Sequence, residues 1–308
     1  MNSLKKSLDK AVSRRFKMLK ITNALRLVNG AGDHLAGLQI DRYHRHIHIQ
    51  MLDGRWHQHI DEIVFFLTSA MPVDYLIVKT RKGLDVQGKT LVGRDPETIV
   101  EEHGLKFKVN LDEGLNCGLF LDMRRNRWMV GQSCQGQRVL NCFAYTCAFG
   151  VHARAGGAAD VINTDISRKV LQRGMLNYGQ NGFTFADGEF VKADSVFYLT
   201  RAFKKGIGFD VIILDPPSFA RHGGQVFQVK RDLPGSIAKA AAVLNSGGSL
   251  FLSTNYSEIS YEDLERMLAR NLNGRRVKHI QRVGQDDDFT GSNSFKESFL
   301  VGLWVKFF

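Results

Sequence analysis

The sequence predicts a doubly wound α/β fold, in which a parallel sheet carries helices on both faces. From about residue 138 onward, short apolar runs alternate with helical patterns, the order that crossovers between parallel strands require. One run, Val211-Ile-Ile-Leu-Asp-Pro-Pro-Ser-Phe219, describes a buried strand that stops abruptly. Its two prolines remove backbone donors and fix φ, so the backbone leaves the sheet at Asp215.

The predicted elements follow one another in a regular order. Strands are expected at Arg138–Asn141, Asp160–Asn163, Phe190–Lys192, Val211–Leu214 and Ser249–Ser253. Helices are expected at Val151–Gly156, from Ser167 (the N-cap) to Asn177, and at Ile237–Leu244, which precedes a turn at Gly247-Gly248.

Loops follow the first three of these strands, at Asn141–Gly150, Thr164-Asp165 and Ala193-Asp194, and Asp215 stands at the end of the fourth. Because open α/β sheets bind ligands at the carboxyl ends of their strands, these loops are candidate binding segments. Asp165 stands roughly 20 residues after the first loop, the spacing at which a carboxylate bonds a nucleoside ribose. Asp194, after the third strand, is placed to meet an adenine. Together with Asp215, these residues predict a site for an adenosine-containing cofactor with a second substrate beside it. Each Asp taken singly is more often a helix cap.

The first loop indicates a cofactor without a pyrophosphate. A dinucleotide requires a G-x-G-x-x-G loop, whereas Asn141–Gly150 contains only Gly150 and is otherwise aromatic and small. A nicotinamide-dependent oxidoreductase, which shares the fold, is therefore disfavoured.

The order of motifs resembles one family over nearly the whole chain. N-C-F-x-Y-T-x-x-F from Asn141, D-x-S from Asp165, A-D at Asp194 and D-P-P-x-F from Asp215 are similar to class I S-adenosylmethionine-dependent methyltransferases, specifically the bacterial 23S rRNA base methyltransferases. The resemblance extends upstream over Arg26–Arg42, Glu101–His103 and Leu121–Arg127. It implies a Rossmann-like class I methyltransferase sheet with a smaller N-terminal α/β domain, and S-adenosyl-L-methionine as cofactor.

The resemblance also implies the site residues. Those expected to bind the cofactor are Arg124, Asn141, Phe143, Tyr145, Thr146, Asp165, Ser167, Asp194, Ser195 and Asp215. Those expected to hold or face the reacting base are Asp215, Pro216, Phe219 and Asn255. Arg124 and Arg127, one turn apart, are either helix-surface charges or groups beside the cofactor or a phosphate.

One position separates the possible chemistries. Cytosine-C5 members carry a Cys after the fifth strand, because a thiolate must add to the base, whereas this chain has Asn255, as guanine-N7 members do. Its cysteines, Cys117, Cys134, Cys142 and Cys147, lie away from the fourth and fifth strand ends in the sequence. Guanine N7 is a free lone pair, for which in-line positioning suffices. Cytosine C5 and an exocyclic amine remain alternative acceptors. A non-enzymatic RNA-binding protein with a decayed methyltransferase core is also an alternative, because Cys147 and Ala148 replace glycines that are common in the first loop.

Two domains are expected, a small basic one over 1–105 and the methyltransferase domain over 106–308. Family members usually begin with a PUA domain, and this chain starts near the helix that follows it, so that helix is expected to contact RNA. Its cations are Lys5, Lys6, Lys10, Arg14, Arg15, Lys17 and Lys20, between apolar Leu4, Leu8, Val12, Phe16 and Leu19.

Further expectations are a hairpin at Ala36–Leu52 with a turn near Asp53-Gly54, a helix at Ile60–Ser69, a strand at Tyr75–Lys79, a strand pair at Leu105–Leu111 and Gly118–Leu121, and a helix from Arg124.

Composition agrees with a polyanionic partner. The formal net charge is +11 and the pI about 9.5, which favours RNA as the partner, here 23S rRNA or a large-subunit assembly particle.

The sequence has neither a membrane-spanning run nor a secretion signal, and its cysteines form no C-x-x-C pair, so the expected location is the cytoplasm. His44, His46 and His48, at period two, are expected on an exposed strand face beside RNA rather than around a metal. The oligomeric state stays open.

Overall fold

The computed structural model describes residues 3–82, 85–114, 116–222, 225–291 and 299–308. The chain forms two compact units, one of Met1–Asp122 with Asp286–Ser298 and one of Met123–Gln285 with Phe299–Phe308. This division differs from the expected boundary at residue 105. The reason is a hairpin, since β6 (Glu97–Glu102) pairs antiparallel with β7 (Leu105–Asn110), and the described part of Gly118–Leu121 forms no strand beside it.

The first unit contains a five-stranded sheet in the order β1-β2-β3-β4-β5. Its strands are β1 (Ala24–Asn29), β2 (Leu38–Tyr43), β3 (His46–Met51), β4 (Tyr75–Lys82) and β5 (Asp85–Val92). Its helical segments are α1 (Ser3–Arg14), η1 (Phe16–Lys20), η2 (Gly30–Asp33), η3 (Gly54–His59) and α2 (Ile60–Ala70). Leu8, Ile40, Ile49 and Ile63 belong to one fully buried cluster that joins the helices to the sheet. The expected hairpin, helix and strand at 36–79 are confirmed.

The turn of that hairpin lies at a different place from the one expected. It falls at His44, whose φ is +57°, while Asp53 instead caps η3 by accepting a bond from the Arg55 N–H. His46 and His48 are buried, which contradicts the exposed histidine face. Burial, followed by the charges of Lys79 and Arg26, lowers the pKa of His48 to about 3. Among the described residues, no group of three or more His, Cys, Asp or Glu side chains is arranged to hold a metal ion.

The basic N-terminal helix is shorter than expected, because it ends where a buried ion pair forms. The Arg15 guanidinium donates to both carboxylate oxygens of Asp33, at 2.9 and 2.6 Å, and to the Asp288 carbonyl oxygen at 2.8 Å. Arg15 is 1% exposed, so it is unavailable to RNA. Phe16 and Leu19, two apolar positions of the expected helix, lie beyond its end and are exposed on η1.

The second unit has the predicted doubly wound fold. Its seven-stranded sheet has the order β10-β9-β8-β11-β14-β16-β15, in which the first five strands are parallel and β16 is antiparallel to both neighbours. The strands are β8 (Arg138–Cys142), β9 (Asp160–Asp165), β10 (Phe190–Lys192), β11 (Phe209–Leu214), β14 (Leu244–Thr254), β15 (Val277–Val283) and β16 (Val301–Phe307). Each predicted strand of this half is present. A small hairpin, β12 (Phe219–His222) with β13 (Gln225–Gln228), follows β11.

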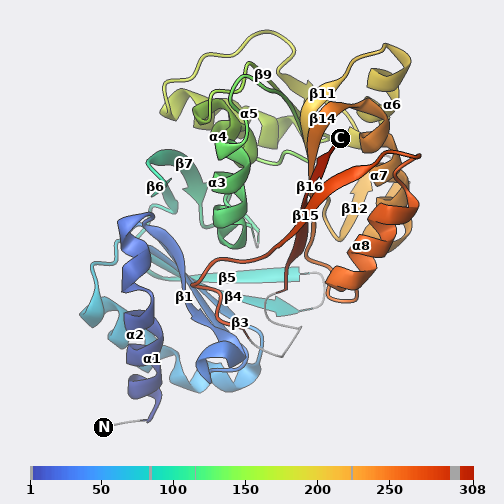
Figure 1. Ribbon diagram of the computed structural model, residues 1–308. Helices are drawn as coiled ribbons and strands as arrows, with labels where there is room; N and C mark the ends of the chain where they lie inside the picture. Colours follow the sequence, from blue (N-terminus) through green and yellow to red (C-terminus); the bar gives the residue numbers. More distant parts are fainter. Residues whose placement is uncertain (1–2, 83–84, 115, 223–224, 292–298) are drawn as a thin grey trace. The chain divides into compact units, whose positions relative to one another are not determined.

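Helices cover both faces of this sheet (Figure 1). On one side lie α3 (Arg124–Gln132), α4 (Ala148–Ala155) and α5 (Arg168–Gln180), and on the other α6 (Ser195–Lys204), α7 (Val229–Val243) and α8 (Tyr261–Arg270). Strand β11 shows the alternation: Val211 and Ile213 pack in the core that contains Val130 of α3, whereas Ile212 and Leu214 pack in the core that contains Leu199 of α6. Burial on both faces explains its uninterrupted apolar run. No described helix is long and apolar enough to cross a membrane.

The buried pair in the first unit yields a stability prediction. Asp33→Ala leaves the Arg15 guanidinium buried without its counter-ion and removes the acceptor of the Asn29 N–H, so the first unit should lose about 3–5 kcal/mol of unfolding free energy. Denaturant unfolding followed by circular dichroism measures this loss. Asp9→Ala, at an exposed position of α1, should change stability by less than ~0.5 kcal/mol. Equal stability of the two variants would contradict the assignment.

Candidate functional site

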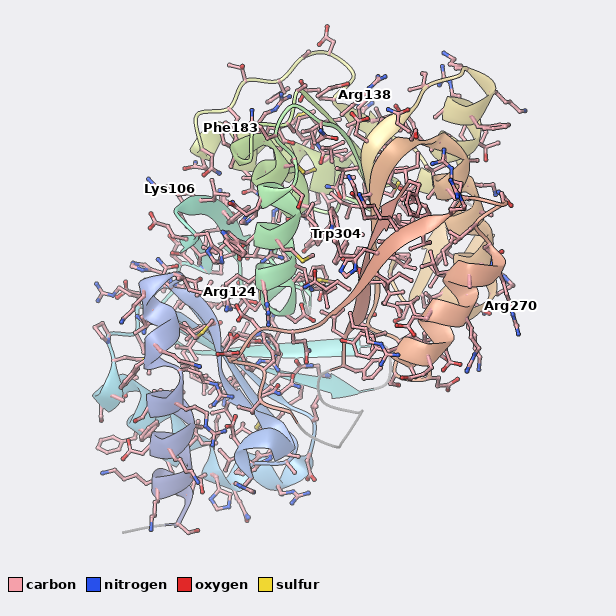
Figure 2. All side chains as sticks on the ribbon, in the orientation of Figure 1. Lys106, Arg124, Arg138, Phe183, Arg270 and Trp304 are labelled. Carbon is pink, nitrogen blue, oxygen red and sulfur yellow. The ribbon has the colours of Figure 1, made fainter. Side chains whose placement is uncertain are left out.

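The candidate site is the edge of the sheet at which the parallel strands end. Cys142 is in register with both Thr164 and Leu214, and Leu214 with Leu252, so the segments that follow β8, β9, β11 and β14 leave from neighbouring positions. Figure 2 labels Arg138 at the top of this unit, which marks the opposite, amino end of β8. Four predicted segments therefore meet at one edge: Phe143–Cys147, Asp165–Ser167, Asp215–Phe219 and Ser253–Asn255.

Asp165 is fixed by backbone hydrogen bonds at the end of β9. One carboxylate oxygen accepts from the Tyr145 N–H at 3.0 Å and the other from the Ser167 N–H at 2.9 Å. Burial raises the pKa of Asp165, and the bonds from Ser167 and Tyr145 oppose that rise. Ser167 caps α5 as predicted, its hydroxyl accepting from the Val170 N–H. Asp165 is therefore rigid, and each carboxylate oxygen has a second lone pair.

The loop after β8 has an unusual backbone. Phe143, Tyr145 and Cys147 have φ values of +55°, +50° and +61°, in the left-handed region that favours glycine. Each such residue costs of order 1–3 kcal/mol and persists only where its surroundings hold it. The Phe143 N–H donates to the Ser195 hydroxyl at 2.8 Å, and the Ala144 N–H donates to the Thr164 carbonyl oxygen at 2.9 Å. The strand and helix beside the loop thus impose its shape without glycine.

Several residues expected to touch the cofactor form hydrogen bonds within the protein. The buried Asn141 amide donates to the Asn163 side-chain oxygen at 2.9 Å, and the Ser195 hydroxyl lies 2.8 Å from the Thr164 hydroxyl. Thr146 is 1% exposed, and its carbonyl oxygen accepts from Asn177. These contacts indicate that Asn141, Thr146 and Ser195 shape the loop.

Asp194 and Arg124 differ in exposure. Asp194 is exposed and caps α6, with one carboxylate oxygen accepting from the Phe197 N–H at 2.8 Å. Arg124 is 0% exposed, in the first turn of α3, where Figure 2 labels it at the lower end of the helix. Arg127 is also buried, so neither arginine is a helix-surface charge.

Two hydrogen bonds join the loop after β11 to the carboxyl end of β14 and to the residue that follows it. The Ser253 hydroxyl donates to Asp215 Oδ1 at 2.7 Å, and the Ser218 hydroxyl donates to Asn255 Oδ1 at 2.6 Å. Phe219 is 50% exposed at the start of β12. The sequence analysis did not predict that Ser253 and Ser218 would hold Asp215 and Asn255. The signal that could have identified these serines is that each lies close in the sequence to a predicted site residue. Asp215, Phe219 and Asn255 come from neighbouring segments of this edge.

Cys142 lies closer to this edge than the sequence suggested. Its register with Leu214 places it beside the end of the fourth strand, contrary to the expectation that every cysteine lies elsewhere. It is nevertheless fully buried in the core, where burial raises the pKa of its thiol to about 12. Burial raises the pKa of Cys134 to about 12 and that of Cys147 well above its ordinary value. A thiolate is the nucleophilic form, so burial disfavours the reactive form of these three cysteines.

Comparison with known proteins establishes the family. Residues 66–294 match the model of the S-adenosylmethionine-dependent methyltransferase family. The chain belongs to this family. Ribosomal RNA large subunit methyltransferase I of Photobacterium profundum is 34% identical over 288 residues, which cover 90% of this chain and 72% of that protein. The protein of the same name from Escherichia coli is 30% identical over 298 residues, covering 93% and 74%.

A solved structure agrees with this assignment. SMU.776, described as a methyltransferase in complex with SAH, superposes with a TM-score of 0.88 at 26% identity and covers 98% of this chain and 80% of that one. The methyltransferase described here therefore uses S-adenosyl-L-methionine, and its second unit has the corresponding Rossmann-like fold. Asp165, with its carboxylate fixed by two backbone N–H groups, and the exposed Asp194 therefore remain the residues that we expect to bind the ribose and the adenine.

The site yields a prediction for cofactor binding. We expect the Asp165 carboxylate to accept from the ribose hydroxyls, so Asp165→Ala should remove a hydrogen bond to a charged group, which costs about 1.5–3 kcal/mol, or roughly 10- to 150-fold in affinity. Isothermal titration calorimetry with S-adenosyl-L-methionine measures it, with an unfolding curve to verify that the loop remains folded. The matched control is Asp160→Ala, at the other end of the same strand, which should bind like the wild type. Unchanged affinity in Asp165→Ala would contradict the role of this carboxylate.

Proposed function

We propose that this methyltransferase modifies a base of large-subunit ribosomal RNA, with guanine N7 as the acceptor atom. The named relatives support the RNA class, and the net charge of +11 favours a polyanionic substrate. The observation that carries the choice of atom is Asn255 beyond β14, hydrogen-bonded to Ser218, where addition to cytosine would need a thiol. The three buried thiols of this unit, with their raised pKa values, support noncovalent transfer.

The protein's part in this reaction is positioning. When bound, S-adenosyl-L-methionine supplies an electrophilic methyl group on its sulfonium. Asp215, held by Ser253, accepts a hydrogen bond from a base N–H, the Pro216 carbonyl oxygen accepts a second, and the exposed Phe219 ring stacks on the base. Asn255 contacts an edge of the base. N7 carries no proton, so its attack on the methyl group requires neither a covalent adduct nor a general base.

An exocyclic amine is the second candidate acceptor. A single observation favours it, namely that a carboxylate and a proline carbonyl at one strand end can also accept from an amino group. In that reaction the amine loses a proton after transfer, and the Asp215 carboxylate is the group that we expect to receive it. Guanine N7 is preferred because of Asn255.

We further propose that the first unit contributes RNA contacts through α1 and η1. Lys10 and Arg14 are exposed, and Arg14 lies 3.4 Å from the Asp33 carboxylate. Lys17 is paired with Asp287 at 2.5 Å, so it has a competing partner. Exposed Phe16 adds an aromatic surface on which a base can stack.

Two substitutions at neighbouring positions test the noncovalent reaction. Asp215→Ala should lower kcat for RNA methylation by about 10- to 100-fold while leaving cofactor affinity nearly unchanged, because it removes a contact to the base. Cys142 pairs in register with Leu214, the residue before Asp215. Cys142→Ala should retain methyl transfer within a few-fold of the wild type, provided that its cofactor affinity and stability are shown to be unchanged. Loss of an attacking nucleophile costs several orders of magnitude. A Cys142→Ala enzyme that binds cofactor normally and is inactive would therefore overturn the noncovalent reaction.

A further inference from the structure

A second basic surface lies at the amino ends of the parallel strands, the edge of the sheet opposite the candidate site. Its cations come from the end of α6, from the segment that enters β15 and from the end of β16. They are Arg201, Lys204, Lys205, Arg276, Lys278 and Lys306, all exposed, and we refer to them as the amino-edge surface. Phe203, beside them on α6, is 62% exposed.

Hydrogen bonds show that these segments are neighbours. At the start of β11, Asp210 accepts from the Asn245 side chain at 2.7 Å, and the Asn245 carbonyl oxygen accepts from Arg275 at 3.3 Å. The Phe308 N–H donates to the Arg276 carbonyl oxygen at 3.2 Å, at the end of β16 marked C in Figure 1. Three strand spacings separate β11 from β15, so the surface spans about 14 Å.

Within the described ranges, the cations of this surface are not paired with carboxylates, although the Arg276 guanidinium lies over the Phe308 ring, 5.2 Å from its centroid. In the part of the chain that the structure describes, none of the six forms an ion pair, and α6 has no acidic residue in its first turn or elsewhere. The nearby Asp160 is paired with Arg138 at 3.0 Å. The surface of α8 is different, because Arg266 pairs with Asp263 at 2.5 Å and Arg282 with Glu265 at 2.8 Å.

We propose that the amino-edge surface binds the phosphate backbone of the RNA substrate at a point distant from the target base. This inference rests on the proposed function, namely that the substrate is RNA. Unpaired cations spread over about 14 Å match a polyanion with closely spaced charges, and an exposed aromatic among them offers a surface for a base. The six residues of β11 separate the two edges by about 20 Å, so the RNA must extend at least that far from its methylated base.

The triple substitution Lys204→Ala, Lys205→Ala and Arg276→Ala tests this binding surface. Removing one cation–phosphate interaction reduces the log–log salt dependence of RNA binding by about 0.7–0.9, so the slope should fall by about 2–3. The KM for a large-subunit rRNA fragment should rise while kcat and cofactor affinity stay unchanged. The matched control is Arg266→Ala, Arg270→Ala and Arg282→Ala, which removes the same net charge around α8, where Figure 2 labels Arg270; its slope should equal that of the wild type.

Substrate length gives a second measurement. With a minimal oligonucleotide carrying the target base, the amino-edge variant and the wild type should have equal KM, because the RNA cannot reach the distant edge. A wild-type slope in the amino-edge variant, or an equal decrease of slope in the α8 control, would overturn the proposal. If the wild type itself neither binds nor methylates rRNA, the proposed function fails and this inference fails with it.

Discussion

The loop between β8 and α4 turns three times through left-handed backbone without a glycine, and the arrangement of the site depends on this constraint. Such a loop is stable only if neighbouring elements hold it. Strand β9 supplies the Thr164 carbonyl and the Asp165 carboxylate, and α6 supplies the Ser195 hydroxyl. Asp165, the carboxylate that we expect to bind the cofactor, is therefore also one of the groups that hold the loop, and we expect a change at this residue to alter both cofactor affinity and local stability.

Sequence signals were informative where the structure of one element determines them, and were not where a contact depends on several elements. Strand β11 was predicted correctly because a fully buried strand is a continuous apolar run in the sequence. The Ser167 cap was predicted correctly because a Ser directly before a helical pattern is a specific signal for the start of a helix. The proximity of Cys142 to Leu214 could not be predicted, since it depends on strand order. The roles of Asn141 and Ser195 depend likewise on partners far apart in the sequence.

The first unit was harder to predict for related reasons. A histidine with positive φ gives no turn signal, so the hairpin was expected to turn at Asp53-Gly54. The helix with the N-terminal cations was expected to contact RNA, but one of these cations, Arg15, pairs with Asp33 and is buried. Charge patterns in sequence identify cations, whereas only the tertiary structure separates those that are paired from those that are free to bind a polyanion.

The chemistry assigned to the site follows from which groups can be reactive there. Burial that raises the pKa values of the thiols and an Asn beyond β14 support the proposal that the protein mainly positions the base, and N7 of guanine is an acceptor that positioning alone can serve. The most direct test is to methylate large-subunit rRNA with the purified protein and labelled S-adenosyl-L-methionine, digest the RNA and identify the labelled nucleoside by mass spectrometry. The account predicts 7-methylguanosine; labelled 5-methylcytidine would contradict it.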